Sequence, residues 1–164
     1  MKGLLKTLNE KKHAQTDFQL FDARHIATWE HLYFAAINAL VAFRNRRNIS
    51  KSVAVETLLY ASAQGQIQKA TRLLGVRIDS SDIAVLIVGK RSEPIQSLLS
   101  TISENVGRKR DDRVLEVTVE KSESIRRFFE VSENQLRAAK HGRSLERALI
   151  DLVIERVALV AVRS

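Results

Sequence analysis

The amino-acid sequence predicts an α+β fold, a single domain in which a small mixed β-sheet packs with several helices. One segment, Ile83 to Val88, is an uninterrupted run of β-branched and aliphatic residues, which is typical of a strand buried on both faces. Several longer segments repeat apolar residues every three or four positions, as helices with one buried face do. Because strands and helices do not alternate regularly, the order does not match a doubly wound α/β fold.

The size and composition are those of one ordered domain. The chain has 164 residues, of which 45% are hydrophobic and 28% charged, enough to build a proper core. We expect residues 1–16 to form an N-terminal extension and residues 17–164 to form the domain. The sequence contains no cysteine, which excludes disulfides and sulfur-based zinc sites and favours a reducing compartment.

Membrane insertion is not expected. The longest stretch without a charge, His31 to Phe43, has 13 residues, whereas a membrane span needs about 20. We therefore expect a cytoplasmic protein.

In the first part of the chain, Phe18, Leu20 and Phe21 predict a short strand that ends at Asp22. A helix is expected from about Thr28 to Arg44, because its apolar residues recur at steps of three and four. The predicted buried face of this helix holds Trp29, Leu32, Tyr33, Ala36, Ile37, Leu40 and Phe43.

A turn at Asn48-Ile49-Ser50 then provides N-cap residues for a second helical run, in which Val55, Leu58, Leu59 and Ser62 share a face. Gly65 is expected to end that run. A third helix, from about Ile67 to Leu74, stops at Gly75, a residue type that often follows a helix end.

After the strand at 83–88, the residues Ser92-Glu93-Pro94 predict the start of a helix that continues toward Gly107. A polar loop is expected from Lys109 to Arg113. Leu115, Val117 and Val119 alternate with polar residues, which predicts a half-exposed strand.

The C-terminal part is expected to be helical. Ser132 and Gln135 have the spacing of a capping box, and Ser144 is expected to cap a last helix that runs to about Arg156. The periodicity of Val157 to Val162 is compatible with either a strand or a helix end.

Charge is distributed unevenly along the sequence. The net charge is +8, which makes a polyanionic partner plausible. Four cations stand together without an acid between them: Arg44, Arg46, Arg47 and Lys51. The segment from Thr101 to Ser164 instead mixes 13 basic with 11 acidic residues, as an ordinary solvated surface does.

No arrangement typical of an enzyme is apparent. The glycines are too far apart for a phosphate-binding loop, and no two histidines are three or four residues apart, so we expect no nucleotide cofactor and no metal. His31 is expected to be a hydrogen-bonded structural residue. Asp22 and Arg24 could form a catalytic pair, but a strand-end ion pair or helix cap explains them better.

Glu56 is an acid within a run of apolar and small residues, and a buried carboxylate needs a partner. One interpretation pairs it with Arg46, Arg47 or Lys51. The other is that it accepts hydrogen bonds from the hydroxyl groups of a ligand.

A family resemblance emerges when several short segments are taken together in order. These are Asp22-Ala23-Arg24 with Ile26, His31-Leu32 with Ala35 and Ala39, Asn48 to Ser52, Glu56 to Leu59, Gln66-Ile67 with Ala70 and Gly75, Leu145-Glu146, and Glu155 to Leu159. Over roughly Phe18 to Val162 the chain resembles the small subunit of the KEOPS complex that binds the kinase-like protein of that complex. In animals this family is called the PRPK-binding protein.

The resemblance implies a non-catalytic subunit of the complex that installs threonylcarbamoyladenosine in tRNA. Such a subunit docks on the kinase-like ATPase and holds the single-stranded CCA end of the tRNA. It implies two partners, the kinase-like ATPase and the tRNA 3′ end, with no membrane and no small-molecule substrate. The alternative is a regulatory domain that acts on a kinase without binding RNA.

Site residues follow from combining this resemblance with the residue types that RNA needs, which are cations for phosphates and polar side chains for hydroxyls and base edges. The expected RNA-binding residues are Arg46, Arg47, Lys51, Ser52, Glu56, Gln66 and Lys69. Tyr60 and Ile67 could provide pocket walls, although helical periodicity favours a core position for both. Kinase docking is expected on an apolar stripe of the terminal helix: Leu145, Leu149, Leu152 and Val153. We expect no catalytic residues.

Overall fold

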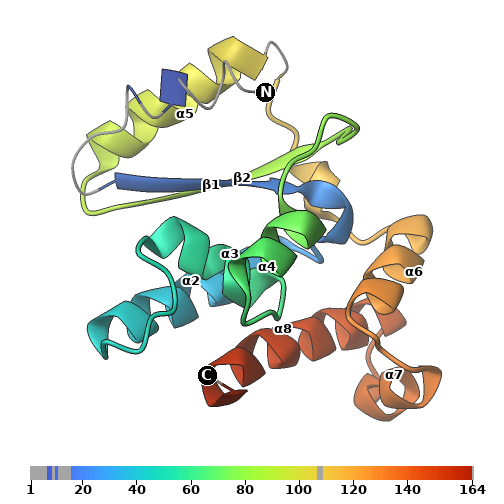
Figure 1. Ribbon diagram of the computed structural model, residues 1–164. Helices are drawn as coiled ribbons and strands as arrows, with labels where there is room; N and C mark the ends of the chain where they lie inside the picture. Colours follow the sequence, from blue (N-terminus) through green and yellow to red (C-terminus); the bar gives the residue numbers. More distant parts are fainter. Residues whose placement is uncertain (1–6, 9, 11–15, 107–108, 164) are drawn as a thin grey trace.

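The sheet of the protein consists of two antiparallel strands. A computed structural model describes residues 7, 8, 10, 16–106 and 109–163. Strands β1 (Thr16–Asp22) and β2 (Ile83–Gly89) pair along their whole length, with Thr16 opposite Gly89 and Asp22 opposite Ile83 (Figure 1). The predicted α+β class is confirmed. The sheet is antiparallel rather than mixed, because these are its only two strands among the described residues.

Helices cover both faces of this sheet. Helix α5 (Ser92–Val106) lies over one face, where Leu98 and Ile102 pack with Leu20 of β1. Helices α3 (Val53–Ala61) and α4 (Ile67–Leu74) lie on the other side (Figure 1), where Phe21 and Ala84 belong to the main core. Alternate residues of β2 therefore pack on opposite faces, as its continuous apolar sequence predicts.

The predicted N-terminal extension, 1–16, lies mostly outside the described residues. Leu8, which is described, is fully buried and packs with Leu98 and Ile102 on the α5 side of the sheet. Thr16 is the first residue of β1. At least one residue that precedes the predicted domain boundary thus belongs to the core.

The predicted strand at Leu115, Val117 and Val119 is wrong. The short 3₁₀ helix η2 (Asp112–Leu115) is followed by helix α6 (Val119–Phe128), whose N-cap is Thr118. The Thr118 hydroxyl accepts a hydrogen bond from the Lys121 amide at 3.2 Å, so a local cap takes the place of strand pairing. Leu115 and Val117 pack against two different parts of the core, which explains their alternation.

Helix α2 (Trp29–Arg44) has the predicted extent but a different buried face. Its buried residues are mainly small and include Ala35, Ala39 and Ala42, which pack against α3 and the last helix. Among the large residues of the predicted face, Trp29 is 63% exposed and Tyr33 is 52% exposed. The prediction failed because apolar residues occupy both sides of the helix, and the side that packs closely against its neighbours is the one with the small residues.

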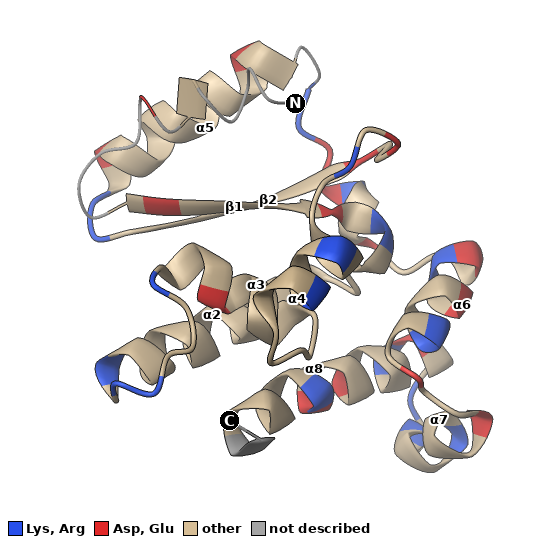
Figure 2. Ribbon diagram, viewed as in Figure 1, with Lys and Arg blue, Asp and Glu red and all other residues tan. Residues whose placement is uncertain are grey.

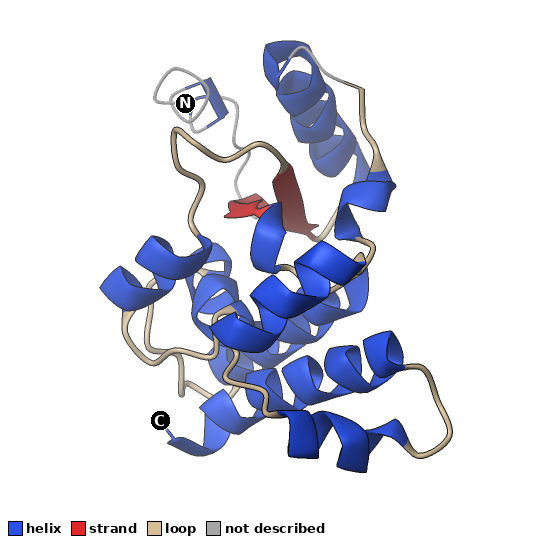
Figure 3. Ribbon diagram, turned by 90° about the vertical axis from the view of Figure 1, so that its right-hand side faces the viewer, coloured by secondary structure: helices blue, strands red, loops and turns tan. Residues whose placement is uncertain are grey.

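The last three helices form a second part of the core. Helix α6 is followed by α7 (Glu133–Lys140) and α8 (Leu145–Arg163) (Figure 3). The predicted capping box at Ser132 and Gln135 is confirmed. Helix α8 continues well past Arg156, so 157–162 is helix rather than strand. The core here contains Ile125 and Leu136 together with the inward side chains of α8.

Two polar side chains that the sequence singles out are structural. His31 is fully buried; its Nδ1 accepts a hydrogen bond from the Ala27 amide, and its Nε2 lies 2.9 Å from the Ala61 carbonyl oxygen. Burial lowers the pKa of His31 to about 4, so the ring is neutral near pH 7. Asp22 pairs with Arg24 at 2.6 Å and caps the 3₁₀ helix η1 (Ala23–His25), as the non-catalytic interpretation predicted.

Candidate nucleic-acid interface

The end of α2 forces an arginine into an unusual backbone conformation. The Arg46 amide donates to the Phe43 carbonyl at 3.2 Å, and the Arg47 amide donates to the Ala42 carbonyl at 2.9 Å. This pair of bonds is the Schellman motif, which ends a helix and requires a left-handed residue. That residue is Arg46, with φ of 56°, where glycine is the usual choice. The Arg46 and Arg47 side chains are consequently exposed at the end of the helix.

Glu56 holds the loop that follows. Its side chain is 1% exposed, and it accepts hydrogen bonds from two successive backbone amides. The Ile49 amide lies 3.1 Å from both carboxylate oxygens, and the Ser50 amide lies 2.7 Å from Oε2. The interpretation that pairs Glu56 with Arg46, Arg47 or Lys51 is therefore wrong, because its partners are the Ile49 and Ser50 amides. Contact with a ligand stays a prediction, and the burial of Glu56 does not favour it.

Further hydrogen bonds fix the same loop. Asn48 donates from its amide nitrogen to the Ser50 carbonyl, and the Ser50 hydroxyl donates to the Ser52 carbonyl, each at 2.9 Å. Ser52, rather than Asn48 or Ser50, is the N-cap of α3, where its hydroxyl accepts from the Val55 amide. The loop from Asn48 to Ser52 is therefore fixed by hydrogen bonds between its own residues and by the hydrogen bonds to Glu56 of α3.

The four cations at this end of α2 have no acidic partners among the described residues. Arg44, Arg46, Arg47 and Lys51 are all exposed. Within the described part of the chain, none of the four forms an ion pair. Figure 2 shows basic segments at the end of α2 and in the loop after it. We call these four residues the cationic loop. Ile49, 43% exposed, stands among them.

The remaining predicted RNA-binding residues lie elsewhere. Gln66 is the N-cap of α4 and Lys69 is exposed on that helix. The cationic loop precedes α3 and these residues follow it, so the nine residues of α3 separate the two groups, a length of about 13 Å. Figure 2 likewise shows the basic residues of α4 apart from those of the loop. Tyr60 lies in the core, as periodicity predicted, whereas Ile67 is exposed.

The predicted docking stripe of α8 lies mostly in the core. Leu149 and Val153 are almost completely buried and belong to the second part of the core. Leu152 is half-buried against the same core, and Leu145, at the start of the helix, is exposed. Leu149 and Val153 therefore hold α8 in the fold, and only the other two reach the surface.

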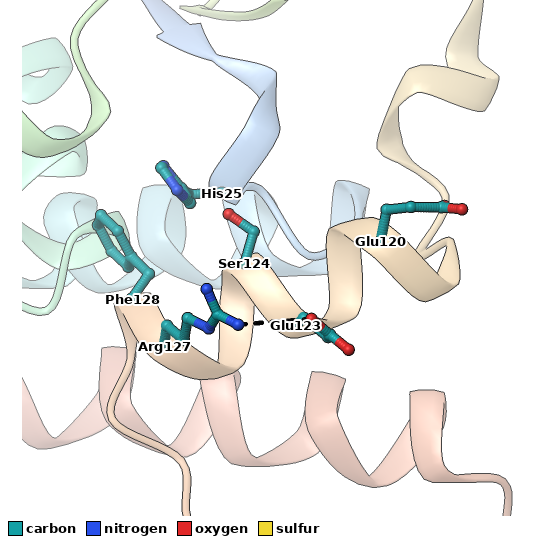
Figure 4. A pocket seen from close by; sticks show the side chains of 6 residues that line it. All are labelled: His25, Glu120, Glu123, Ser124, Arg127 and Phe128. Carbon is teal, nitrogen blue, oxygen red and sulfur yellow. Dashed lines mark ion pairs between the residues drawn. The ribbon is translucent and has the colours of Figure 1, made fainter.

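An open pocket between η1 and α6 was not predicted, because no motif in the sequence indicates it. It has a volume of about 410 Å³ and is lined by His25, Glu120, Glu123, Ser124, Arg127 and Phe128 (Figure 4). The His25 ring stacks on Phe128 with centroids 4.5 Å apart. Burial lowers the pKa of His25. Arg127 pairs with Glu123 at 3.6 Å, and Glu120 points away from the other side chains, so the acids do not converge on the histidine.

The described residues bring no three histidine or acidic side chains together in a way that could hold a metal ion. None of their helices is long and apolar enough to cross a membrane.

Comparison with known proteins identifies the family. The family model for the kinase binding protein CGI-121 matches residues 1–161. The chain is also similar to the regulatory protein Cgi121 of Methanocaldococcus jannaschii, with 28% identity over 155 residues, which is 94% of this chain and 90% of that protein. The family match extends over nearly all of the chain, including the predicted extension, and confirms the predicted resemblance. The chain belongs to the CGI-121 family of kinase-binding proteins.

Proposed function

We propose that this protein is a non-catalytic subunit of the KEOPS complex, which makes threonylcarbamoyladenosine in tRNA. In this role it docks on the kinase-like ATPase subunit and binds the single-stranded CCA end of tRNA with its cationic loop. The family membership supports the kinase partner. The observation that carries the RNA contact is the group of four exposed cations without acidic partners.

The cationic loop has the features that a single-stranded RNA end requires. Free arginine and lysine side chains can follow phosphates, and the exposed Ile49 offers an apolar surface for a base. The hydrogen bonds to Glu56 fix the backbone before a ligand arrives, which reduces the ordering cost of binding. We assign phosphate contacts to Arg46, Arg47 and Lys51.

The other predicted RNA-binding residues have different roles in this proposal. Glu56 supports the loop without touching RNA. The Ser52 hydroxyl already accepts a hydrogen bond from the Val55 amide, so any contact with RNA must be made in addition to this cap. Gln66 and Lys69 form a second, separate group on α4 that a longer stretch of RNA could reach.

The proposed absence of catalysis is consistent with the geometry around the most plausible acid–base residues. His31 uses both ring nitrogens in the core, and Asp22 is tied to Arg24 and Ser80. We expect the purified protein neither to hydrolyse ATP nor to modify tRNA. Turnover of either substrate by protein free of contaminants would contradict this expectation.

A binding experiment with two forms of tRNA tests the RNA contact. Intact tRNA and tRNA trimmed of its CCA should be titrated against the wild type and an Arg47→Glu, Lys51→Glu variant. We expect trimming to remove most of the wild-type affinity. The double variant should lose about tenfold or more for intact tRNA, and each lost contact should flatten the plot of log affinity against log salt by about 0.7.

Arg91→Glu with Arg110→Glu is the matched control, because both arginines are exposed and ion-paired and the change in net charge is the same. This control should keep most of the affinity. Equal binding of trimmed and intact tRNA by the wild type would refute binding of the CCA end. Equal losses in both double variants would mean that only overall charge matters, which favours the alternative of a kinase regulator without specific RNA binding.

A further inference from the structure

Helix α2 carries a row of large apolar side chains on its outer side. Twelve large apolar residues are strongly exposed in the described part of the chain, and half of them lie on this helix. They are Trp29, Tyr33, Phe34, Ile37, Leu40 and Val41, each 40% exposed or more. At about 100° per residue, these six positions fall on one side of the helix, opposite the buried alanines. We call these six residues the outer face of α2.

The outer face is ordered and large. Trp29 meets Tyr33 edge to face with ring centroids 6.1 Å apart, and Tyr33 meets Phe34 in the same way at 5.6 Å. The helix has 16 residues, a length of about 24 Å. A contiguous apolar surface rich in aromatic residues is typical of a protein–protein contact.

The charges around this face indicate what kind of partner fits it. At the N-terminal end, Glu30 is tied to Arg147 at 2.7 Å. At the C-terminal end, Arg44, which is not among the residues assigned to RNA, has no acidic partner in the described structure. The free charge bordering the face is thus positive, which fits an apolar partner surface with an acidic edge. A second copy of this chain, which also carries a net charge of +8, is a poorer fit.

We propose that the outer face of α2 is the surface that binds the kinase-like ATPase. This inference rests on the proposed kinase docking and specifies where it occurs. The predicted stripe of α8 offers only Leu145 and Leu152 at the surface, whereas α2 presents six large apolar side chains. The cationic loop continues from the same helix, so the kinase and the RNA end bind next to each other.

Truncation of the outer face tests the proposal. A Tyr33→Ala, Ile37→Ala variant removes two central side chains and leaves the buried alanines untouched. The matched control is Ile78→Ala with Val119→Ala, since both residues are exposed and lie far along the chain from α2. Binding to the purified kinase-like ATPase of the same genome should be measured by calorimetry, with tRNA binding, thermal unfolding and sedimentation of each variant in parallel.

We expect the α2 variant to bind the kinase-like ATPase at least about tenfold more weakly, as loss of central contact residues does. The control should bind like the wild type, and both variants should keep tRNA affinity. If the α2 variant does not fold, Phe34→Ala with Val41→Ala tests the same face.

Wild-type kinase affinity in folded α2 variants would overturn the inference while leaving kinase docking itself intact. A loss of tRNA binding alone would assign the face to RNA, and a change of oligomeric state alone would assign it to a second copy; either result overturns the inference. A wild-type chain that does not bind the ATPase would refute the proposed docking and this surface together.

Discussion

Two groups of arginines in this molecule differ in what surrounds them. Every described arginine between positions 110 and 147 forms an ion pair with an acid, for example Arg113 with Asp111 at 2.6 Å and Arg143 with Asp151 at 2.8 Å. The arginines of the cationic loop form none within the described structure. Exposed ion pairs contribute little to stability, but they neutralise the charge that an RNA would otherwise meet. Pairing, rather than the number of arginines, therefore distinguishes a candidate binding surface from a solvated one.

The largest effect is expected from removing the support of the cationic loop. Glu56→Ala leaves the buried Ser50 amide and the partly buried Ile49 amide without their acceptor, which should cost about 3 kcal/mol of unfolding free energy. The variant should also bind tRNA more weakly, because the loop is no longer fixed. Denaturant unfolding and tRNA titration measure the two effects.

Glu56→Gln is the control for this change, since it keeps the shape and one acceptor oxygen. It should lose less stability than Glu56→Ala and less tRNA affinity. If both variants bind tRNA like the wild type despite a loss of stability, the loop geometry has no part in binding.

The stability of the fold should depend on pH through His31, whereas the charges of the cationic loop should not change with pH. His31 has a folded pKa of about 4, below its usual value of 6.5, so the unfolded chain takes up the proton first. Stability is fully present above pH 6.5 and is lost as the pH falls toward 4. Between pH 6.5 and pH 5 we expect a loss of about 1.5 kcal/mol.

Denaturant unfolding at several pH values measures this loss, and His31→Leu should flatten the profile between pH 6.5 and pH 5. The flattening is partial, because burial also lowers the pKa of His25. Arginines keep their charge throughout, so tRNA affinity should not change between pH 6.5 and 8. A steep change in affinity over that range would point to a histidine in the RNA contact.

A smaller effect is expected at the end of α2. Arg46→Gly places glycine at a left-handed position and should raise the unfolding free energy by about 0.5 to 1 kcal/mol. The same change removes one phosphate contact, so tRNA affinity should fall a few-fold and the salt slope by about 0.7.

Glu130→Gly is a matched control, because Glu130 has φ of 52° in the same kind of helix end after α6. It should gain similar stability and leave tRNA binding unchanged. An Arg46→Gly variant with full tRNA affinity would remove Arg46 from the proposed contact.

The smallest effect is expected from freeing the paired arginines. Asp111→Asn with Asp112→Asn removes the partners of Arg113 and Arg110 and raises the net charge by two, because two negative charges are lost. Because these residues lie far along the chain from the cationic loop, tRNA affinity should rise by less than about twofold at 0.15 M salt, where exposed charges are screened. A gain as large as the loss in the loop variant would show that position is unimportant.

Local signals in the sequence predicted a good part of the fold. The capping box at Ser132 and the Ser92-Glu93-Pro94 helix start depend on neighbouring residues only, and both helices begin where expected. The strand at 83–88 was predicted from its uninterrupted apolar run. The structure confirms it, since residues of this run pack on both faces of the sheet. The apolar alternation at Leu115 to Val119 was misleading, because residues of an irregular segment can contact two parts of the core as strand residues do.

The candidate site was predictable only in part. The unpaired cations follow from the absence of acids between Arg44 and Lys51. The partner of Glu56 could not be predicted from the sequence, because it consists of backbone amides and every residue type except proline has one. The outer face of α2 was missed for a related reason. Hydrophobic periodicity assigns the largest side chains to the core, whereas close contact with α3 and α8 needs the smallest ones.

The alanine-lined contact of α2 has a consequence for how the chain tolerates substitution. Ala35 and Ala39 are fully buried, so a larger residue there has no room and should lower the unfolding free energy by about 1 to 3 kcal/mol. On the opposite side, Trp29 or Tyr33 can be replaced by polar residues with little loss of stability in isolation. A screen that selects only for soluble expression would therefore keep the alanines and erase the aromatic residues. Only a selection that also requires the proposed partner would preserve both sides of the helix.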